Sequence, residues 1–385
     1  MQLSVIILNY NVRHFLELCV LSVQKAIQNL DAEIIVVDNN STDDSCVMMK
    51  QLFPKVKLIQ NLENLGFPKG NNIGVAEAKG EYICILNPDT VVAEDTFEKI
   101  LAFVEKQKNL GIIGCKLIDG TGNFLPESKR GIPTPWVAFT KIIGLYKVFP
   151  KSTYFNKYYA QYLNENETGK VDILVGAFMI LKRDLYTEIG GFDENCFMYS
   201  DDIDLSYRVL QKEKSNYYFH ETTVIHYKGE STIKDKLYMK RFREAMEFFY
   251  KKHFRVSLFF DFLMTVGTFF FTLFKKNQVV NIKRKIEQYV LISEDDIIKN
   301  KVENLLGNKV ETIKIDDKKL IHSLLYNAVL NTEVLLDANS LSYKDCVDFM
   351  SNIKNSFVTF KIIPTNADYI IGSNSSNDRG EVIKF

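Results

Sequence analysis

The sequence predicts an α/β fold: a first domain built on a mostly parallel sheet, then an apolar helix, then a second, smaller α/β domain. The prediction rests on apolar runs of strand length that alternate with helix-like segments, because this alternation covers both faces of a parallel sheet with helices. An apolar stretch interrupts the alternation once. We therefore expect domains at residues 1–252 and 281–385, joined by a membrane-associated helix or linker at 253–280.

The bulk composition excludes several classes of protein. The chain has 385 residues, of which 46% are hydrophobic, enough for a sizeable core in each of two domains. Its 48 basic residues balance 48 acidic ones, so no nucleic-acid partner is expected. The six cysteines show no paired metal-binding spacing, which argues against zinc and favours a reducing compartment. The N-terminal MQLSVIILNYN is interpreted as a strand rather than a signal peptide, and a cytoplasmic location follows.

Four strand-like runs open the chain, namely SVIILNY, EIIVVDN, VKLIQN and EYICILNPD, with helix-like segments at His14 to Gln28 and Asn71 to Lys79. In parallel sheets, ligands bind beyond the carboxyl ends of the strands. Polar residues follow three of these strands, so we expect them to converge on one rim of the sheet. They are Asn9 with Asn11, Asp38 to Asp43, and Asn87 to Asp89.

Two features of this rim suit a nucleotide. Asp38 ends a buried-looking strand, where its carboxylate can accept a hydrogen bond from a ring N–H of a nucleobase; an Asx turn or helix N-cap is the alternative. The stretch NLENLGFPKGNNIG combines glycine, which permits close backbone approach to a ligand, with asparagine. Gly70, followed by Asn71 and Asn72 at a predicted helix start, would offer N–H groups to a phosphate. The residues of interest in this stretch are Asn64, Gly66, Gly70, Asn71, Asn72 and Gly74.

A divalent-cation site is expected at Asp89, which LNPDT presents directly after an apolar strand and a proline. One or two carboxylates together with substrate phosphates are the usual ligands of Mg²⁺ or Mn²⁺ beside a diphosphate. The alternative for Asp89 is a simple helix N-cap. His226 could add an imidazole, although a lone histidine in an apolar strand is more often a core residue.

The later part of the first domain carries an acidic cluster. VDILVGAFMILKRDLYTEIGGFDE predicts two strands and a short helix, NYYFHETTVIHYKGES predicts a further strand, and a charged helix is expected at Lys234 to Lys252. Between them, FMYSDDIDLSYR crowds Asp201, Asp202 and Asp204. These carboxylates could form a solvated helix start with Asp201 as N-cap and Asp204 at N3, bind a cation, or include a proton acceptor. The spacing leaves all three open.

The apolar stretch Val256 to Phe274 is nearly long enough to span a bilayer. Its polar residues recur at helical intervals, and basic residues flank both ends. We expect an interfacial helix, with a spanning helix and a helix buried against protein as alternatives. The second alternating unit that follows predicts a small Rossmann-like sheet. SEDD, rather than a glycine-rich turn, follows its first strand YVLIS, so dinucleotide binding is not expected.

The ordered series SVIILNYN, VVDNNSTDDS, ENLGFPKGNN, LNPDT, VGAFMILKRD, GGFDE and FMYSDDIDL with HYKGES resembles the family 2 glycosyltransferases, and within them the bacterial rhamnosyltransferase-like enzymes. The resemblance covers about the first two thirds of the chain. It implies a GT-A fold and transfer, with inversion, of a sugar from a UDP- or dTDP-linked donor. The implied acceptor is a hydroxyl of a lipid-linked glycan in surface-polysaccharide synthesis, at the inner face of the cell membrane.

The resemblance also implies roles for individual residues. Asn9 and Asp38 would border the nucleobase, Asp89 would bind Mg²⁺ or Mn²⁺, and Asp202 would be the general base, with Asp201 in place of the usual Glu. The nucleotide and sugar would be lined by Asn64, Gly66, Gly70, Asn71, Asn72 and Asn87.

Two departures from the family pattern bear on this site. Asn87-Pro88-Asp89 replaces the Asp-x-Asp metal motif, which predicts weak metal affinity or a contribution from His226. Asp201 is one methylene shorter than Glu, which bears on its supporting role. A non-catalytic nucleotide-binding or membrane-scaffold protein and a nucleotidyltransferase remain as alternative hypotheses. Arg130 and Trp136 are expected either to face the acceptor or to pack in a surface loop.

Overall fold

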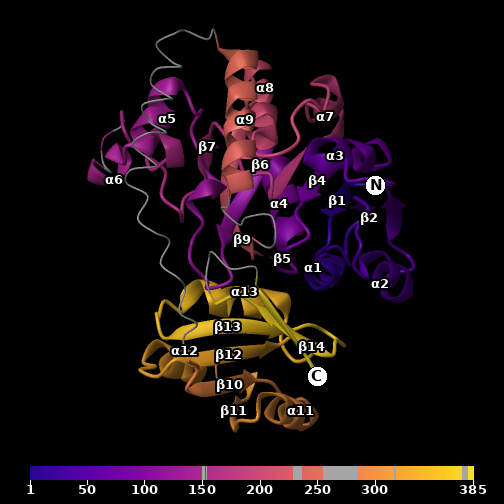
Figure 1. The fold of residues 1–385 in the computed structure, drawn as a ribbon, viewed down its shortest axis with the longest axis vertical. Helices are drawn as coiled ribbons and strands as arrows, with labels where there is room; N and C mark the ends of the chain where they lie inside the picture. Colours follow the sequence, from indigo (N-terminus) through magenta and orange to yellow (C-terminus); the bar gives the residue numbers. More distant parts are fainter. Residues whose placement is uncertain (150–151, 153, 229–235, 255–284, 316–317, 375–379) are drawn as a thin grey trace.

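The computed structural model describes residues 1–149, 152, 154–228, 236–254, 285–315, 318–374 and 380–385. Two sheets with their helices form an N-terminal unit and a C-terminal unit (Figure 1). The predicted membrane-associated segment falls almost entirely at 255–284 and lies outside the described residues. Among the residues that are described, no helix combines the length and the apolarity needed to cross a bilayer.

The sheet of the N-terminal unit has nine strands within the described residues, in the order β3-β2-β1-β4-β8-β6-β9-β5, with β7 paired to β9. The first four positions in this order are parallel to one another, whereas β8 runs antiparallel to β4 and β6. The sheet is therefore mixed, with its parallel part at the N-terminal side. The strands are β1 (Leu3–Asn9), β2 (Ala32–Asp38), β3 (Lys57–Gln60), β4 (Tyr82–Leu86), β5 (Thr90–Val92), β6 (Leu110–Ile118), β7 (Gly169–Val171), β8 (Phe178–Lys182) and β9 (Ser215–His226).

Helices of the N-terminal unit form where apolar residues recur at helical spacing. The first of them buries Leu16, Cys19, Val20 and Val23, spaced i, i+3, i+4 and i+7, in the core beneath the sheet. The helices are α1 (Arg13–Ala26), α2 (Ser45–Leu52), α3 (Gly66–Ala76), α4 (Thr96–Val104), α5 (Pro135–Ile142), α6 (Leu145–Val148), α7 (Arg183–Glu188), α8 (Asp201–Gln211) and α9 (Lys236–His253).

The glycines of α3 explain why this helix lies close to the sheet. A Cβ added at Gly70 would overlap the side chain of Leu8, and one at Gly74 would lie 2.6 Å from Cγ2 of Ile6. Both neighbours belong to β1, so these two glycines let the helix approach the strand. The helix begins at Gly66, five residues before the predicted start at Asn71, because GFPKG is already helical.

The C-terminal unit has a six-stranded sheet within the described residues, in the order β11-β10-β12-β13-β14-β15. Its first four positions are parallel, and β14 and β15 add antiparallel strands at one edge. Helix α11 packs on one face of the sheet, and α12 and α13 pack on the other. The elements are β10 (Gln288–Ile292), α11 (Asp296–Leu306), β11 (Val310–Ile313), α12 (Lys318–Tyr326), β12 (Thr332–Asp337), α13 (Tyr343–Asn352), β13 (Val358–Ile363), β14 (Tyr369–Gly372) and β15 (Glu381–Lys384).

The two units meet where α13 faces the N-terminal unit (Figure 1). The carboxylate of Glu94 accepts the first N–H groups of α13, from Tyr343 at 2.8 Å and Lys344 at 2.7 Å. The Lys344 amine also pairs with Asp95 at 2.6 Å. An apolar cluster continues from one unit into the other. A negative charge at a helix N-terminus is favourable, so the contact fixes the end of α13.

Gly122 offers a test of this contact. It has φ +80° and lies against α13, where an added Cβ would overlap the carbonyl oxygen of Met350. Gly144 has φ +79° with no atom within 4 Å of such a Cβ. We expect Gly144→Ala to lower the free energy of unfolding by about 1–2 kcal/mol through left-handed strain alone, and Gly122→Ala to cost roughly 1–3 kcal/mol more through overlap with backbone. Urea unfolding of the full chain measures both, and equal costs would contradict the packing described.

Candidate functional site

The carboxyl ends of β1 and β2 form one side of the candidate site. Asn9 and Asp38 are partners in the register of the two strands, and both are buried. The Asn9 amide donates to Asp38 Oδ1 at 2.7 Å, and the N–H of Ser41 donates to Asp38 Oδ2 at 2.8 Å. The Asp38 carboxylate is therefore fixed in place by the Asn9 amide and by a backbone N–H three residues further along the chain. The Oδ1 of Asn9 is buried with no hydrogen-bond partner among the described residues, which leaves an acceptor at this rim.

The predicted glycine loop lies beside this pair, with one correction. Because α3 begins at Gly66, Gly70 and the two residues after it lie inside the helix, and only the first four N–H groups of a helix lack an internal partner. The prediction that Gly70, Asn71 and Asn72 present N–H groups at a helix start is therefore wrong. At the actual start, Asn64 Oδ1 accepts the N–H of Gly66 at 3.0 Å.

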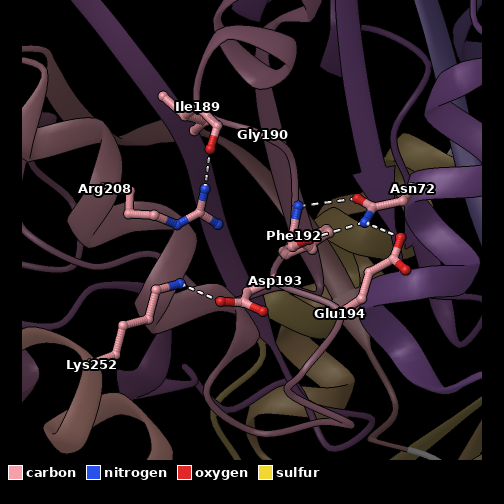
Figure 2. A pocket seen from close by; sticks show the side chains of 8 residues that line it. All are labelled: Asn72, Ile189, Gly190, Phe192, Asp193, Glu194, Arg208 and Lys252. Atoms are coloured by element: carbon pink, nitrogen blue, oxygen red, sulfur yellow. Dashed lines mark hydrogen bonds and ion pairs between the residues drawn. The ribbon is translucent and has the colours of Figure 1, made fainter.

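Asn72 is engaged by protein groups at both ends of its amide (Figure 2). Its Oδ1 accepts from the N–H of Phe192 at 3.0 Å and from the hydroxyl of Tyr186 at 2.5 Å. Its Nδ2 donates to the Phe192 carbonyl and to Glu194, each at 2.9 Å. This asparagine thus ties α3 to the turn after α7.

Asn87, Asp89 and His226 come together at the end of β4. His226 is opposite Thr90 in the pairing of β5 with β9. Its Nε2 lies 3.4 Å from Asp89 Oδ1 and 3.3 Å from Asn87 Nδ2. Its Nδ1 is buried with no hydrogen-bond partner among the described residues. The predicted proximity of this histidine and Asp89 is present, so His226 is more than a packed core residue.

The chemistry of this donor set fits a hard divalent ion only in part. A carboxylate and an imidazole nitrogen stand close together, but the described residues contain no group of three or more His, Cys, Asp or Glu side chains that could hold a metal ion. Phosphate oxygens of a bound donor would have to complete the coordination shell, as is common for Mg²⁺.

The acidic cluster lies at the start of α8. Ser200 is the N-cap and Asp201 is the first helical residue, so the alternative of a capping box with Asp201 as N-cap does not hold. Asp201 and Asp202 are 7% and 8% exposed, and Asp204 is fully buried. A solvated helix start is therefore excluded.

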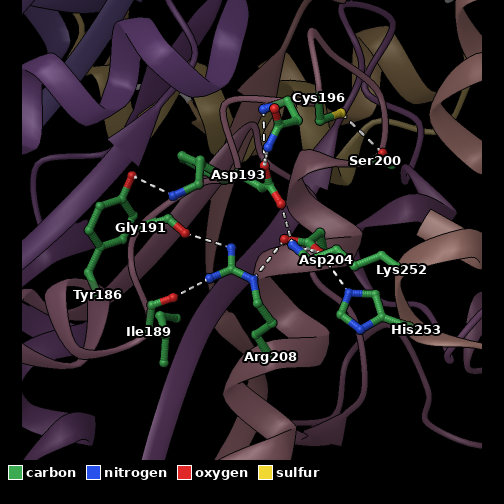
Figure 3. Close-up of polar contacts among 12 residues, drawn as sticks. Tyr186, Ile189, Gly191, Asp193, Cys196, Ser200, Asp204, Arg208, Lys252 and His253 are labelled. Atoms are coloured by element: carbon green, nitrogen blue, oxygen red, sulfur yellow. Dashed lines mark hydrogen bonds and ion pairs between the residues drawn. The ribbon is translucent and has the colours of Figure 1, made fainter. Parts of the chain in front are cut away.

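The Asp204 carboxylate contacts three basic side chains (Figure 3). Its carboxylate is within 2.7 Å of Arg208 Nε, 2.8 Å of Lys252 Nζ and 2.6 Å of His253 Nε2. These contacts join α8 to the last turn of α9. The three carboxylates thus divide, with Asp204 holding helices together and the other two facing a different environment.

Asp202 is held by a residue from a distant part of the chain. Nη2 of Arg130 lies 2.5 Å from Asp202 Oδ2, and the N–H of Gly176 donates to the same oxygen at 3.1 Å. Nη2 also donates to the carbonyl of Leu174 at 3.2 Å. Burial lowers the pKa of the Arg130 guanidinium and the Asp202 charge raises it, with a net rise, so Arg130 stays charged. No local sequence pattern connects Arg130 to α8, so this pairing could not be expected from the sequence.

Asp201 differs from its neighbour in its electrostatics. Burial, and then the negative charge of Asp202, raise the pKa of Asp201 to about 7, while backbone N–H groups of Asp201 and Tyr199 oppose the rise. No ion pair joins Asp201 to a cation in the described part of the chain. Near neutral pH this carboxyl therefore exchanges its proton, whereas Asp202 has a guanidinium beside it.

Both parts of the candidate site lie at one edge of the sheet. Strand β4 pairs with β8, and the N–H of Asn87, two residues before Asp89, donates to the carbonyl of Ala177 at 3.0 Å. Gly176, the neighbour of Ala177, is the residue that donates to Asp202. The chain of contacts from Asp89 to Asp202 is therefore short, and the arrangement joins the end of β4 to the start of α8.

A separate cavity of about 340 Å³ is lined by residues of α3, α8, α9 and the segment after α7 (Figure 2). Within it Arg208 donates to the carbonyl of Ile189, and Lys252 pairs with Asp193. Of the residues predicted for the site, this cavity contains only Asn72 among the described residues. Its polar groups satisfy one another, so it serves the packing of α8 and α9.

The fold and the site define a class of α/β proteins that bind ligands at the carboxyl ends of parallel strands, with carboxylates at the same edge. The family described as "Glycosyl transferase family 2" matches residues 4–190. Residues 4–190 of the N-terminal unit thus match glycosyl transferase family 2, as the motif series predicts, and the unit has a GT-A-like α/β fold. The matched range ends before Asp201, Asp202 and His226.

Several curated proteins are similar to this chain. The N-acetylglucosaminyl-diphospho-decaprenol L-rhamnosyltransferase of Mycobacterium tuberculosis is 25% identical over 213 residues, which cover 52% of this chain and 68% of that protein. The rhamnosyltransferase WbbL of Escherichia coli is 27% identical over 222 residues, covering 53% and 78%. Among solved structures, GalNAc-T7 with UDP, GalNAc and Mn²⁺ aligns with a TM-score of 0.47 at 18% identity, covering 64% of this chain and 48% of that one.

The raised pKa of Asp201 predicts how stability depends on pH. Between its ordinary value of 3.8 and about 7, the folded chain holds a proton that the unfolded chain has released. The contribution of Asp201 to stability is thus fully present below the ordinary value and is lost as the pH rises through about 7. Asp201→Asn removes this loss, so we expect it to raise the free energy of unfolding at pH 8 by roughly 1–3 kcal/mol and to change it little at pH 4.

Asp204→Asn on the same helix is the matched control. Burial raises the pKa of Asp204, but Lys252, Arg208 and His253 lower it by more, so the net pKa lies below the ordinary value. Asp204→Asn leaves these cations without their partner and should destabilise the chain by roughly 3–5 kcal/mol at pH 8. Urea unfolding at both pH values measures the pair of variants. Destabilisation by Asp201→Asn at pH 8 would contradict the assignment of a raised pKa.

Proposed function

We propose that the chain is an inverting glycosyltransferase that moves a hexose or deoxyhexose, such as rhamnose, from a nucleoside-diphosphate donor to a hydroxyl group of a glycan acceptor. The observation that carries the proposal is the short chain of contacts that sets Asp202, with its Arg130 partner, and Asp89, with His226, at one edge of the sheet. Direct displacement needs a proton acceptor on one side of the sugar and charge stabilisation on the other.

The donor would lie along the rim from β2 to β4. Asp38, fixed by Asn9 and Ser41, would accept a hydrogen bond from the ring N–H of a uracil or thymine base. Asn64, Gly66 and the first turn of α3 border this place, so they would line the nucleotide. UDP- and dTDP-linked sugars both carry the required N–H, and the rhamnosyltransferase names of the similar proteins support a deoxyhexose.

Asp89 and His226 would hold Mg²⁺ or Mn²⁺ with the donor phosphates, and Asn87 would contact the same region. Such an ion supplies neutralisation of the charge that develops on a leaving nucleoside diphosphate. The single carboxylate, in place of two, predicts weak affinity for the ion in the absence of donor.

Asp202 would accept the proton of the attacking hydroxyl. As the acceptor oxygen forms its bond to the anomeric carbon, the bond to the nucleoside diphosphate breaks, and the hydroxyl proton passes to Asp202. Arg130 fixes the orientation of the Asp202 carboxylate. The adjacent Asp201 has a pKa raised to about 7 by burial and by the Asp202 charge.

The cellular setting is also part of the proposal. The printed name of the Mycobacterium tuberculosis relative contains a diphospho-decaprenol, which supports a lipid-linked acceptor in surface-polysaccharide synthesis. The enzyme would act at the inner face of the cell membrane as a peripheral protein. We further propose a GT-A domain at 1–252, a membrane-associated helix or linker at 253–280, and a Rossmann-like domain at 281–385.

A panel of UDP- and dTDP-sugars tests the proposal. With Mn²⁺ and an acceptor extract, we expect release of the nucleoside diphosphate from at least one donor. Asp202→Asn should reduce that release by about 10²–10⁴-fold, because the proton acceptor is lost, while donor binding measured by calorimetry stays close to that of the original chain. Asp368→Asn, at an exposed carboxylate of a surface ion pair, is the control and should leave the release unchanged.

Metal dependence and the identity of the leaving group complete this test. Chelation of Mn²⁺, or Asp89→Asn, should lower diphosphate release by weakening stabilisation of the leaving group. Release of pyrophosphate from UTP or dTTP supplied with a sugar 1-phosphate, without diphosphate release from any sugar donor, would identify a nucleotidyltransferase. Donor binding without release of either product, from any sugar in the panel, would identify a non-catalytic nucleotide-binding protein.

A further inference from the structure

The segment at 129–162 has an unusual composition. It contains nine aromatic residues and six basic ones but no Asp or Glu. Trp and Tyr favour the boundary between lipid and water, and basic side chains favour anionic head groups. The aromatic residues are Trp136, Phe139, Tyr146, Phe149, Tyr154, Phe155, Tyr158, Tyr159 and Tyr162, and the basic residues are Lys129, Arg130, Lys141, Lys147, Lys151 and Lys157.

Much of this segment is on the surface. It contains α5 and α6, which project from one side of the N-terminal unit (Figure 1). Trp136 and Phe149 are each 48% exposed, and Tyr154 is 73% exposed. The other large, exposed apolar residues here are Ile143, Val148 and Tyr162. Folded proteins seldom leave so many neighbouring aromatic and aliphatic side chains in water without a binding role.

The aromatic rings form a connected group rather than scattered single residues. Trp136 lies 6.1 Å from Phe139 and 6.0 Å from Phe155, measured between ring centroids. Phe155 lies 5.5 Å from Phe149. These four rings thus form a continuous row that extends from α5 to the segment after α6. We call the described residues of this stretch, namely 135–149, 152, 154 and 155, the aromatic platform.

The platform is anchored at its base, next to the candidate site. Lys129 donates to the carbonyls of Ala160 at 3.1 Å and Leu163 at 2.7 Å, which ties the two ends of the segment together. The hydroxyl of Tyr250 in α9 donates to the Pro133 carbonyl at 2.5 Å. Arg130, between these anchors, is the partner of Asp202. The platform therefore has a fixed connection to the carboxylates of α8.

The cations of the segment divide into two groups. Lys129 and Arg130 are engaged by the protein, and the Lys141 amine lies 3.5 Å from the centre of the Tyr158 ring. Lys147 and Lys157, by contrast, are exposed. The platform therefore presents aromatic side chains with free positive charge beside them and no acidic residue within the segment.

We propose that the aromatic platform is a membrane-binding surface that inserts into the interface of an anionic lipid bilayer. Exposed lysine is depleted at protein–protein interfaces, whereas lysine beside Trp and Tyr is favourable at an anionic bilayer surface. The absence of acidic residues gives the charge complementarity. The inference extends the proposed function, because a platform joined to Arg130 would bring Asp202 close to a lipid-linked acceptor, but membrane binding itself requires neither donor nor acceptor.

Cosedimentation with vesicles tests this surface in the full chain. The vesicles are phosphatidylcholine with or without phosphatidylglycerol. The test variant combines Trp136→Ala, Phe149→Ala and Tyr154→Ala. We expect its partition coefficient for the anionic vesicles to fall by roughly tenfold or more, because interfacial binding scales with inserted apolar area. The control variant removes exposed apolar side chains elsewhere, with Leu62→Ala, Tyr326→Ala and Phe357→Ala, and should partition like the original chain.

A second variant separates charge from apolar insertion. Lys147→Glu with Lys157→Glu should weaken binding to vesicles that contain phosphatidylglycerol and change binding to pure phosphatidylcholine little. Segment 256–274 is intact in every variant, so the comparison isolates the platform. Unchanged partitioning of the aromatic variant, or an equal loss in the control, would overturn the proposal. The proposal would also be overturned if the original chain did not bind vesicles and instead formed a dimer that the aromatic variant could not form. If the original chain binds vesicles as expected but transfers no sugar from any donor, only the proposed function is contradicted.

Discussion

The buried ion pair between Arg130 and Asp202 is the constraint on which the proposed site depends. Its two side chains are each 11% exposed, and the bond spans 72 positions of the sequence. Removing charges from water is costly, so the pair is tolerated only because further contacts surround it. The N–H of Gly176 and the carbonyl of Leu174 provide them. Three separate segments, namely the loop after β6, the approach to β8 and the start of α8, are thereby fixed around one carboxylate.

This arrangement gives two adjacent aspartates different properties. Asp202 has a permanent cation beside it, whereas Asp201 is buried without such a partner among the described residues and has a pKa raised to about 7. The proton content of the pair therefore changes near neutral pH. The third carboxylate of the cluster, Asp204, is neutralised by side chains of α8 and α9. One short acidic stretch thus contains a structural carboxylate and the pair for which we propose a role in proton transfer.

The contact between the two units supports the part of the site that contains Asp89 and His226. Val91 follows the Asp89 segment and Tyr227 follows His226, and both are buried in the apolar cluster shared with the C-terminal unit. The ring of Tyr227 lies 5.3 Å from that of Phe15 in α1. The C-terminal unit, which has no predicted catalytic residues of its own, therefore stabilises the strand ends that carry Asp89 and His226.

Sequence patterns predicted the elements whose signal is local. The first strand and α1 follow from hydrophobic periodicity, and the polar residues after β1, β2 and β4 do converge on one edge. The helix start at Gly66 was missed because GFPKG contains two glycines and a proline, which are poor helix formers by propensity, yet the glycines are required by the close approach of α3 to β1. At α8 the DDID pattern also fits a capping box with Asp201 as N-cap, whereas the helix has Ser200 as its N-cap.

What the sequence could not reveal are the long-range pairs. Nothing in SKRGIPTP identifies Asp202 as the partner of Arg130, and nothing in the sequence places the N–H of Gly176 beside the same carboxylate. Such contacts depend on which strands pair and where loops return, and local patterns do not record this. The motif series and the residue pattern supplied the expectations for Asp202, Asp89 and His226, but not Arg130 as the partner of Asp202.

A double-mutant cycle on the free energy of unfolding tests the central ion pair most directly. It compares Arg130→Met, Asp202→Asn and the double variant at pH 8. The account predicts that Arg130→Met is the most damaging, by roughly 3–5 kcal/mol, because it leaves a buried carboxylate unpaired, and that the double variant recovers at least ~1 kcal/mol of this loss. Additive effects of the two substitutions would show that the two side chains do not interact, and would contradict the account.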